Sequence, residues 1–243
     1  MSWKKFVACG DSHGNLVCEK TKRKFLDFVA EWKPHYRIHL GDFVDAPSLR
    51  KGCSIEESSL GISNDFQAGI EFIREYRPNY LTLGNHDDRI WLHSTHCANG
   101  ILREHCAELA EAAEQEFRKL KIQWVPYHVS RYLQMPEGGP KLLHGFLAGM
   151  NPAKAHFERF GSCLFGHVHA PSSYIAKHID QGQAYALGCM ADIGQMDYAK
   201  KFPNMLGWRR GWIYGMINSK TGAWNAWHVT EDNGEMISPM GIL

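Results

Sequence analysis

The sequence lacks the features that mark several protein classes. Its seven cysteines are odd in number and form no CxxC pair, which argues against a disulfide framework or a thiolate zinc site. No segment approaches the roughly 18 apolar residues of a membrane span. Residues 1–10 also lack the apolar stretch of a signal peptide. We therefore expect a cytoplasmic protein with free thiols and no membrane partner.

An excess of one charge is also missing. Lys and Arg total 27 against 26 Asp and Glu, so the formal net charge is +1. This balance provides no global positive field for nucleic acid, and any such binding must rest on a local patch. What the sequence does have is histidine: its 14 copies raise the question of a metal site.

The first third of the chain repeats a pattern of strand, polar loop and helix. Strands are predicted at 5–9, 36–40 and 80–83, with helices at 20–32 and 64–76 between them. Each strand runs directly into a polar cluster. Because ligands bind at the carboxyl ends of strands in open α/β sheets, these clusters predict a binding site at one sheet edge.

The rest of the chain is richer in strands. A helix is predicted at 101–120, and short strands rich in β-branched or aromatic residues follow it at 141–144, 163–166, 185–188, 212–218 and 224–229. No linker or composition shift divides the chain. We therefore expect one α/β domain over residues 1–243, with two packed sheets and helices outside them.

Five polar clusters carry the candidate chemistry. They are Asp11-x-His13, Gly41-Asp42-x-x-Asp45, Gly84-Asn85-His86-Asp87, His144-Gly145 and Gly166-His167-x-His169. Singly, most could be ordinary turns or buried histidines. Together they offer mixed nitrogen and oxygen ligands in sufficient number for two adjacent divalent ions. Manganese is the first expectation, with iron, zinc, cobalt or nickel as alternatives.

The five clusters resemble the motifs of the calcineurin-like metallophosphoesterase superfamily, in the order DxH, GDxxD, GNH(D/E), H and GHxH. The resemblance covers roughly residues 5–190. It implies a four-layer α/β/β/α sandwich of two mixed β-sheets flanked by helices. It also implies a dinuclear metal site at the carboxyl ends of the strands.

The resemblance assigns a role to each motif residue. One metal would be held by Asp11, His13, Asp42 and His169. The other would be held by Asp42, Asn85, His144 and His167, so that Asp42 bridges the two ions. His86 would be the general acid, and Asp45 would orient it. Paired ions of this kind lower the pKa of a shared water and clamp the phosphoryl oxygens.

Activity is expected to fall below about pH 6, because histidine ligands must be neutral and the unperturbed pKa of histidine is about 6.5. Rates measured between pH 5 and 8 test this expectation. A rate undiminished at pH 5 would contradict it.

The branch of the superfamily is less defined. The protein phosphatases usually carry GDxxDRG and GNHE, whereas this chain has Ala46 after Asp45, and Asp87. The lipid-A pyrophosphatase branch replaces the catalytic histidine with arginine, which His86 contradicts. The run Gly84–Arg89 is similar to that of cyclic-nucleotide and glycerophosphodiester phosphodiesterases, and GNHD also occurs in DNA-repair nucleases.

We therefore expect a phosphodiesterase acting on nucleotides or single-stranded nucleic acid, with Arg89 contacting the phosphate. A phosphomonoesterase, including a protein phosphatase, is the alternative, and a non-catalytic metal-binding scaffold is a remote one. Two segments keep two interpretations each. The side chains of the basic and aromatic segment 195–212 either contact nucleic-acid bases or pack against the edge of the sandwich. The insert 46–63 either covers the site as a lid or is a loop without that role.

Overall fold

The computed structural model describes residues 2–177, 182–196 and 207–243, which form two β-sheets and the helices around them. The larger sheet has the order β13-β12-β11-β10-β1-β2-β3-β4. Its strands are β1 (Trp3–Cys9), β2 (Tyr36–His39), β3 (Tyr80–Thr82), β4 (Gln123–Val125), β10 (Gly211–Asn218), β11 (Trp224–Asp232), β12 (Glu235–Ser238) and β13 (Gly241–Ile242). Strands β1 to β4 are parallel, and β10 to β13 extend the sheet as antiparallel neighbours.

The smaller sheet has the order β5-β6-β7-β9-β8. Its strands are β5 (Leu133–Gln134), β6 (Lys141–Leu143), β7 (Cys163–Phe165), β8 (Ser172–Ile175) and β9 (Gln183–Ala186). The central three strands are parallel, whereas β5 and β8 run antiparallel at the two edges.

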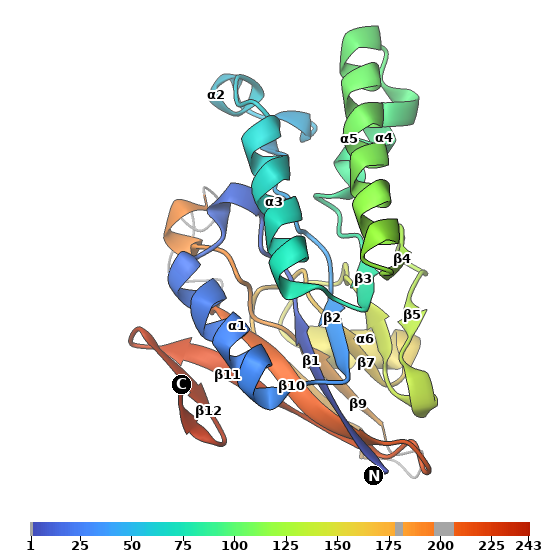
Figure 1. The fold of residues 1–243 in the computed structure, drawn as a ribbon, viewed down its shortest axis with the longest axis vertical. Helices are drawn as coiled ribbons and strands as arrows, with labels where there is room; N and C mark the ends of the chain where they lie inside the picture. Colours follow the sequence, from blue (N-terminus) through green and yellow to red (C-terminus); the bar gives the residue numbers. More distant parts are fainter. Residues whose placement is uncertain (1, 178–181, 197–206) are drawn as a thin grey trace.

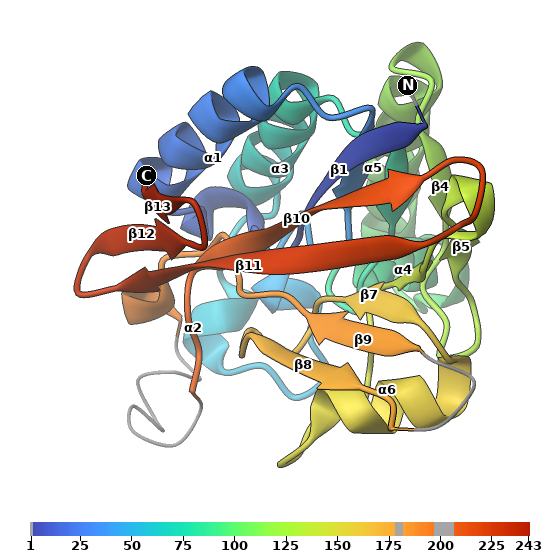
Figure 2. The ribbon, with the colours of Figure 1, turned by 90° about the horizontal axis from the view of Figure 1, so that it is seen from below.

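The described residues also form six α-helices. They are α1 (Glu19–Trp32), α2 (Ile55–Ser58), α3 (Ser63–Tyr76), α4 (Asp88–His96), α5 (Gly100–Lys119) and α6 (Pro152–Phe160). Figure 2 shows the layers: α1 and α3 lie beyond the larger sheet, and α6 lies beyond the smaller one. The expected α/β/β/α sandwich is confirmed. None of the described helices is both long enough and apolar enough to span a bilayer.

Strand β1 shows why the larger sheet sits inside the sandwich. Alternate side chains of a strand point to opposite faces. Phe6 and Ala8 pack in the core between the two sheets, whereas Val7 and Cys9 pack under α1 with Phe25. All five are fully buried, so both faces of β1 are covered by apolar contacts that favour the fold through the hydrophobic effect.

One expected strand is displaced by two residues, and one helix was not expected. The strand expected at 185–188 is β9 at Gln183–Ala186, so Leu187 and Gly188 lie beyond it. The stretch 152–160, for which no element was expected, is α6; its Pro152 occupies the first turn, where a missing backbone N–H costs nothing.

The parallel order of β1, β2 and β3 brings their carboxyl ends together. The pairing continues past the strands, because the N–H groups of Asp11 and His13 donate to the carbonyls of Gly41 and Asp42 at 2.9 Å each. The smaller sheet does the same: Gly166 N–H donates to the His144 carbonyl at 2.9 Å. The polar clusters therefore lie on loops that the sheets hold in register.

Candidate metal centre and its cleft

The loops that carry the polar clusters have an unusual backbone. Their positive φ angles are 52° at Asp11, 51° at His13, 52° at Asp42, 69° at His167 and 55° at His169. Only a few per cent of non-glycine residues adopt this left-handed region, which is enriched at functional sites. The fold thus tolerates local strain at the residues whose side chains must converge.

Two motif glycines leave room for the same side chains. A Cβ on Gly84 would lie 2.1 Å from Asp42 Oδ1. Gly41 has φ +92°, and a Cβ there would lie 2.7 Å from His144 Nδ1. Both positions exclude any larger residue unless Asp42 or His144 moves, which explains why glycine precedes the Asp and the Asn of these motifs.

Asp11, His13 and His169 form the first ligand group. The Nε2 atoms of His13 and His169 lie 3.2 Å apart, and His169 Nε2 lies 3.3 Å from Asp11 Oδ1. His13 Nδ1 lies 2.8 Å from the Asp45 carboxylate, which fixes the proton on Nδ1 and leaves the Nε2 lone pair facing His169. Lone pairs and a carboxylate that converge in a buried space suit a cation.

A second group gathers Asp42, Asn85, His144 and His167. His144 Nε2 lies 3.2 Å from Asp42 Oδ2 and 3.0 Å from Asn85 Oδ1, and His167 Nδ1 lies 2.9 Å from the same Asn85 oxygen. His144 Nδ1 donates to the Leu40 carbonyl at 2.7 Å, which leaves its Nε2 for a metal. The nitrogen and oxygen donors of both groups fit divalent transition ions.

Charge coupling is strong within this group. Burial alone would lower the pKa of His144, but the adjacent Asp42 carboxylate raises it to about 9. Burial, with the neighbouring His144, lowers the pKa of His167 to about 4. The Asp42 carboxylate thus favours the protonated form of His144, whereas burial favours the neutral form of His167 that a metal ligand requires.

His86 lies next to the ligand groups and is held by Asp45. Its Nδ1 lies 2.8 Å from the Asp45 carbonyl oxygen and 3.0 Å from Oδ1, while its Nε2 lies 4.0 Å from Asp42 Oδ2. Burial alone would raise the pKa of Asp45, but its bonds to His13 and His86 hold that pKa well below the usual range. Asp45 therefore remains an anion that orients two imidazoles.

Arg89, on the first turn of α4, braces the turn after β2. Its Nη1 donates to the carbonyls of Asp45 at 2.8 Å and Ala46 at 3.2 Å. A guanidinium has five N–H donors, and these two bonds account for two of them. Arg89 also lines a cleft of about 410 Å³ that it shares with Asp45 and His86.

That cleft connects the site to the insert at 46–63. Its walls include Pro47, Arg50, Glu57 and Leu60 from the insert, and Asn15, Leu16, Asn64, Asp65, Gln195 and Met196 from elsewhere. In Figure 1 the insert, with α2, and the α4–α5 pair project at the same end of the molecule. The insert therefore forms one wall of the approach to His86.

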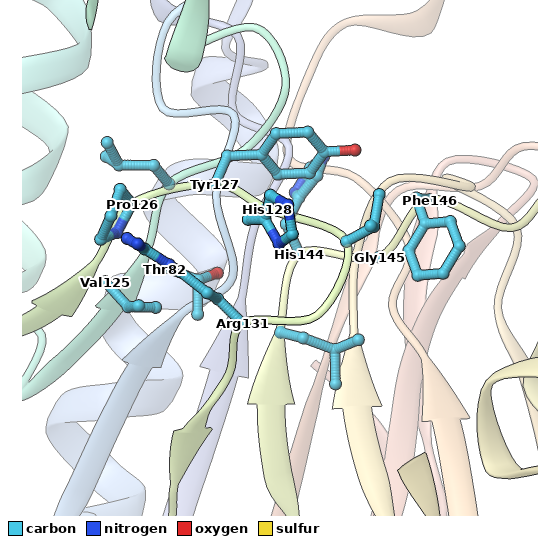
Figure 3. Close-up of a pocket in the computed structure, with 12 residues that line it drawn as sticks. Thr82, Val125, Pro126, Tyr127, His128, Arg131, His144, Gly145 and Phe146 are labelled. Atoms are coloured by element: carbon cyan, nitrogen blue, oxygen red, sulfur yellow. The ribbon is translucent and has the colours of Figure 1, made fainter. Parts of the chain in front are cut away.

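A second, narrow recess lies beside His144 (Figure 3). Tyr127 packs its ring edge-on against the His144 imidazole, with 5.7 Å between ring centres. Burial, with the Asp42 and Asp88 carboxylates, raises the pKa of Tyr127 to about 12, so its phenol stays protonated at neutral pH. Tyr127 thus covers the second ligand group with a neutral polar side chain.

Of the segment 195–212, the structure describes residues 195, 196 and 207–212, and two of its tryptophans lie in different surroundings. Trp212 is buried under α1 with Phe25 and Phe28, as a core residue of the sandwich. Trp208 instead lies against the His169 ring, with 4.4 Å between ring centres. Lys200 and Lys201 lie outside the described residues.

Two carboxylates support the loops of the site in a way that the sequence did not predict. Asp87 accepts from the backbone N–H groups of Gly84 at 2.7 Å, Asp42 at 2.8 Å and Val44 at 3.1 Å. Asp65, on the first turn of α3, accepts from the N–H groups of Asp45 and Ala46. These carboxylates fix the loops rather than the ligands, and apart from Gly84 their partners lie 19 to 45 residues away, too far along the chain for a motif to show.

Replacing Asp87 with alanine is expected to destabilise the protein by about 2–5 kcal/mol, because it leaves three buried N–H groups without their acceptor. Thermal unfolding of metal-free protein measures the loss. The matched variant Asp87→Asn keeps one acceptor oxygen, so it should lose less. Equal melting temperatures for wild type and Asp87→Ala would contradict the supporting role.

Comparison with known proteins places these motifs in a family. Residues 4–171 match the calcineurin-like phosphoesterase family. Among solved structures the chain is similar to vacuolar protein sorting 29 from Cryptosporidium parvum, with 12% identity and a TM-score of 0.48 over 98% of this chain and 96% of that one. No curated protein sequence matches the chain.

Two bacterial structures are also similar. YfcE, a phosphoesterase from E. coli, has 13% identity and a TM-score of 0.39, covering 94% of this chain and 100% of that one. A phosphatase from Mycoplasma pneumoniae has 13% identity and a TM-score of 0.45, covering 96% and 95%.

Proposed function

Because the chain belongs to the calcineurin-like phosphoesterase family, we propose that this metal-dependent phosphoesterase is a phosphodiesterase that uses two divalent ions. Its substrates are nucleotides or single-stranded nucleic acid, manganese is its first-choice metal, and residues 1–243 act as one domain. Asp11, His13 and His169, whose ligand atoms converge, would hold one ion together with Asp42. Asp42, Asn85, His144 and His167 would hold the other. When bound, such ions acidify a water and stabilise the charge that develops on phosphoryl oxygens.

The charge of the cleft beside His86 is the observation that carries the diester preference. The lining contributes three carboxylates (Asp45, Glu57, Asp65) against two guanidiniums (Arg50, Arg89). A phosphomonoester is a dianion near neutral pH, whereas a diester carries one negative charge. The two ions would attract both esters, and beside His86 this lining adds no excess positive charge to hold the second negative charge of a monoester's phosphoryl group, so at that position it favours the diester.

The same cleft accommodates the second ester group that a diester has and a monoester lacks. Leu16, Pro47, Leu60 and Met196 supply apolar surface, and Asn15, Asn64 and Gln195 supply carboxamides. Apolar surface beside hydrogen-bonding side chains can hold an organic ester group and fix its orientation.

His86 is the proton donor in this proposal. Hydrolysis joins the oxygen of water to phosphorus and breaks the bond from phosphorus to the leaving oxygen, which needs a proton. With Nδ1 fixed by Asp45, the proton must come from Nε2, the nitrogen on the Asp42 side. Asp45 acts as a positioning residue because it holds His86 and His13 at once.

A paired assay tests the diester preference. Metal-free protein is reloaded with manganese and given bis-p-nitrophenyl phosphate and p-nitrophenyl phosphate side by side, with chelator-treated protein as the control. We expect two ions per chain and a higher kcat/KM for the diester. Faster monoester cleavage would overturn the preference and favour the phosphomonoesterase alternative.

Replacing Arg89 with methionine is expected to raise KM for bis-p-nitrophenyl phosphate by about tenfold, as for the loss of one charged hydrogen bond. The exposed Arg118→Met, on α5 outside the cleft, is the matched control. A lower melting temperature with unchanged KM would show instead that Arg89 only braces the Asp45–Ala46 turn.

A further inference from the structure

The insert contributes a second guanidinium to the cleft. This guanidinium is paired with a carboxylate from the same insert. Arg50 Nη2 donates to Glu57 Oε1 at 2.6 Å and also contacts Oε2. The Arg50 side chain is 44% exposed, whereas Glu57 is 15% exposed. Arg50 is therefore the accessible partner of a pair that lines the approach to His86.

Glu57 has partners of its own besides Arg50. Its Oε2 accepts from Ser54 N–H at 2.7 Å, and its N–H donates to Ser54 Oγ at 3.1 Å, in a capping box at the start of α2. Glu57 therefore keeps a hydrogen bond when Arg50 turns away. Because the Arg50 side chain is 44% exposed, water can solvate its guanidinium during the exchange, and a more highly charged anion can compensate for the lost contact with Glu57.

From this arrangement, and resting on the proposed phosphodiesterase function, we infer that Arg50 is a specificity-determining residue that binds a second anionic group of the substrate. The group it fits is a terminal phosphate, which has more charge than a carboxylate and accepts two parallel N–H bonds from one guanidinium. In the absence of substrate, the Glu57 carboxylate binds Arg50 where the phosphate would bind.

The position of Arg89 supports the inference. It is half-buried beside His86, on the wall that also carries Asp45, whereas Arg50 lies on the insert. Burial lowers the pKa of Arg89, and the nearby Arg50 charge contributes to the same shift. Because both guanidiniums line one cleft, the structure offers two cationic groups to a substrate with two phosphates.

Two substrates that differ by one phosphate test the inference. Thymidine 5′-(p-nitrophenyl phosphate) has the diester alone, and its 3′-phosphorylated form adds a terminal phosphate. Both release p-nitrophenol. We expect the manganese-loaded wild type to favour the 3′-phosphorylated form by about 10- to 100-fold in kcat/KM, as for a charge-assisted hydrogen bond.

Variants of the pair separate recognition from structure. Arg50→Ala should bring the substrate ratio close to one, and Arg50→Lys should restore part of it. Glu57→Gln breaks the same ion pair but removes the competing anion, so it should raise the ratio. Lys51→Ala, which removes the same charge from the exposed neighbouring residue, should leave the ratio as in the wild type.

The outcomes are distinct from those of the proposed function. A ratio near one in the wild type, or an equal loss with both substrates in Arg50→Ala, would overturn the role of Arg50. If neither diester is cleaved, the proposed phosphodiesterase function is contradicted, and the role of Arg50 is tested by ligand binding instead. Calorimetry should then show tighter binding of thymidine 3′,5′-bisphosphate than of thymidine 5′-monophosphate in the wild type but not in Arg50→Ala, and equal binding would contradict the inference.

Discussion

Replacing His86 with asparagine should lower kcat by about 10²–10⁴-fold for a phenyl ester of thymidine 5′-phosphate and by much less for the p-nitrophenyl ester. A phenol has a pKa of about 10 and leaves poorly as an anion, so it needs the proton that His86 Nε2 provides. The nitro group makes the leaving phenol more acidic, and the need for a donor falls.

The metal content gives this experiment a second readout. His86 lies with His13 and Asp45 in a group that could itself hold an ion, whereas the proposal places His86 outside both ligand sets. His86→Asn should therefore keep two ions per chain. His96→Asn, which replaces an exposed histidine at the end of α4, the helix that follows His86, is the matched control. Loss of an ion, or an equal rate loss with both esters, would contradict the proton-donor role.

The sequence predicted the place of the site because the signal is local. Each cluster directly follows a strand, and parallel strands of consecutive order must end at the same edge. Asp11, Asp42 and Asn85 therefore had to meet, and the structure brings Asp11 and Asp42 together with His144. His144 and His167 come from the second sheet, and only the family resemblance placed them at the same edge.

The supporting shell could not be predicted, because its contacts are long-range. Asp65 on the first turn of a helix looks like an ordinary partner of the helix dipole, yet it holds the loop at Asp45 and Ala46. Short strands such as β5 and β8 have too few residues to show a period. The helix α2 inside the insert was also missed, although its capping box Ser54-x-x-Glu57 is a local pattern that could have indicated its start.

Replacing Asp42 with asparagine should have the largest effect of all, because Asp42 belongs to both proposed ligand groups. Its Oδ2 lies 3.2 Å from His144 Nε2, and its Oδ1 accepts from the backbone N–H of His86 at 2.8 Å. A carboxamide has no charge to share between two cations. We expect bound metal to fall from two ions to one or none and kcat to fall by about 10³-fold or more, as for several kcal/mol of lost stabilisation.

The metal-induced rise in melting temperature tests Asp42 without any substrate. A ligand that binds only the folded state raises stability by RT ln(1 + [L]/Kd), so manganese should raise the melting temperature of the wild type much more than that of Asp42→Asn. The exposed Asp27→Asn on α1 is the matched control and should respond as the wild type does.

Asp42 also differs from His86 in this assay: His86→Asn should keep the full manganese response while losing rate. If Asp42→Asn keeps the response as well, Asp42 does not bridge two ions, and the rate loss must come from the His86 loop that its Oδ1 holds.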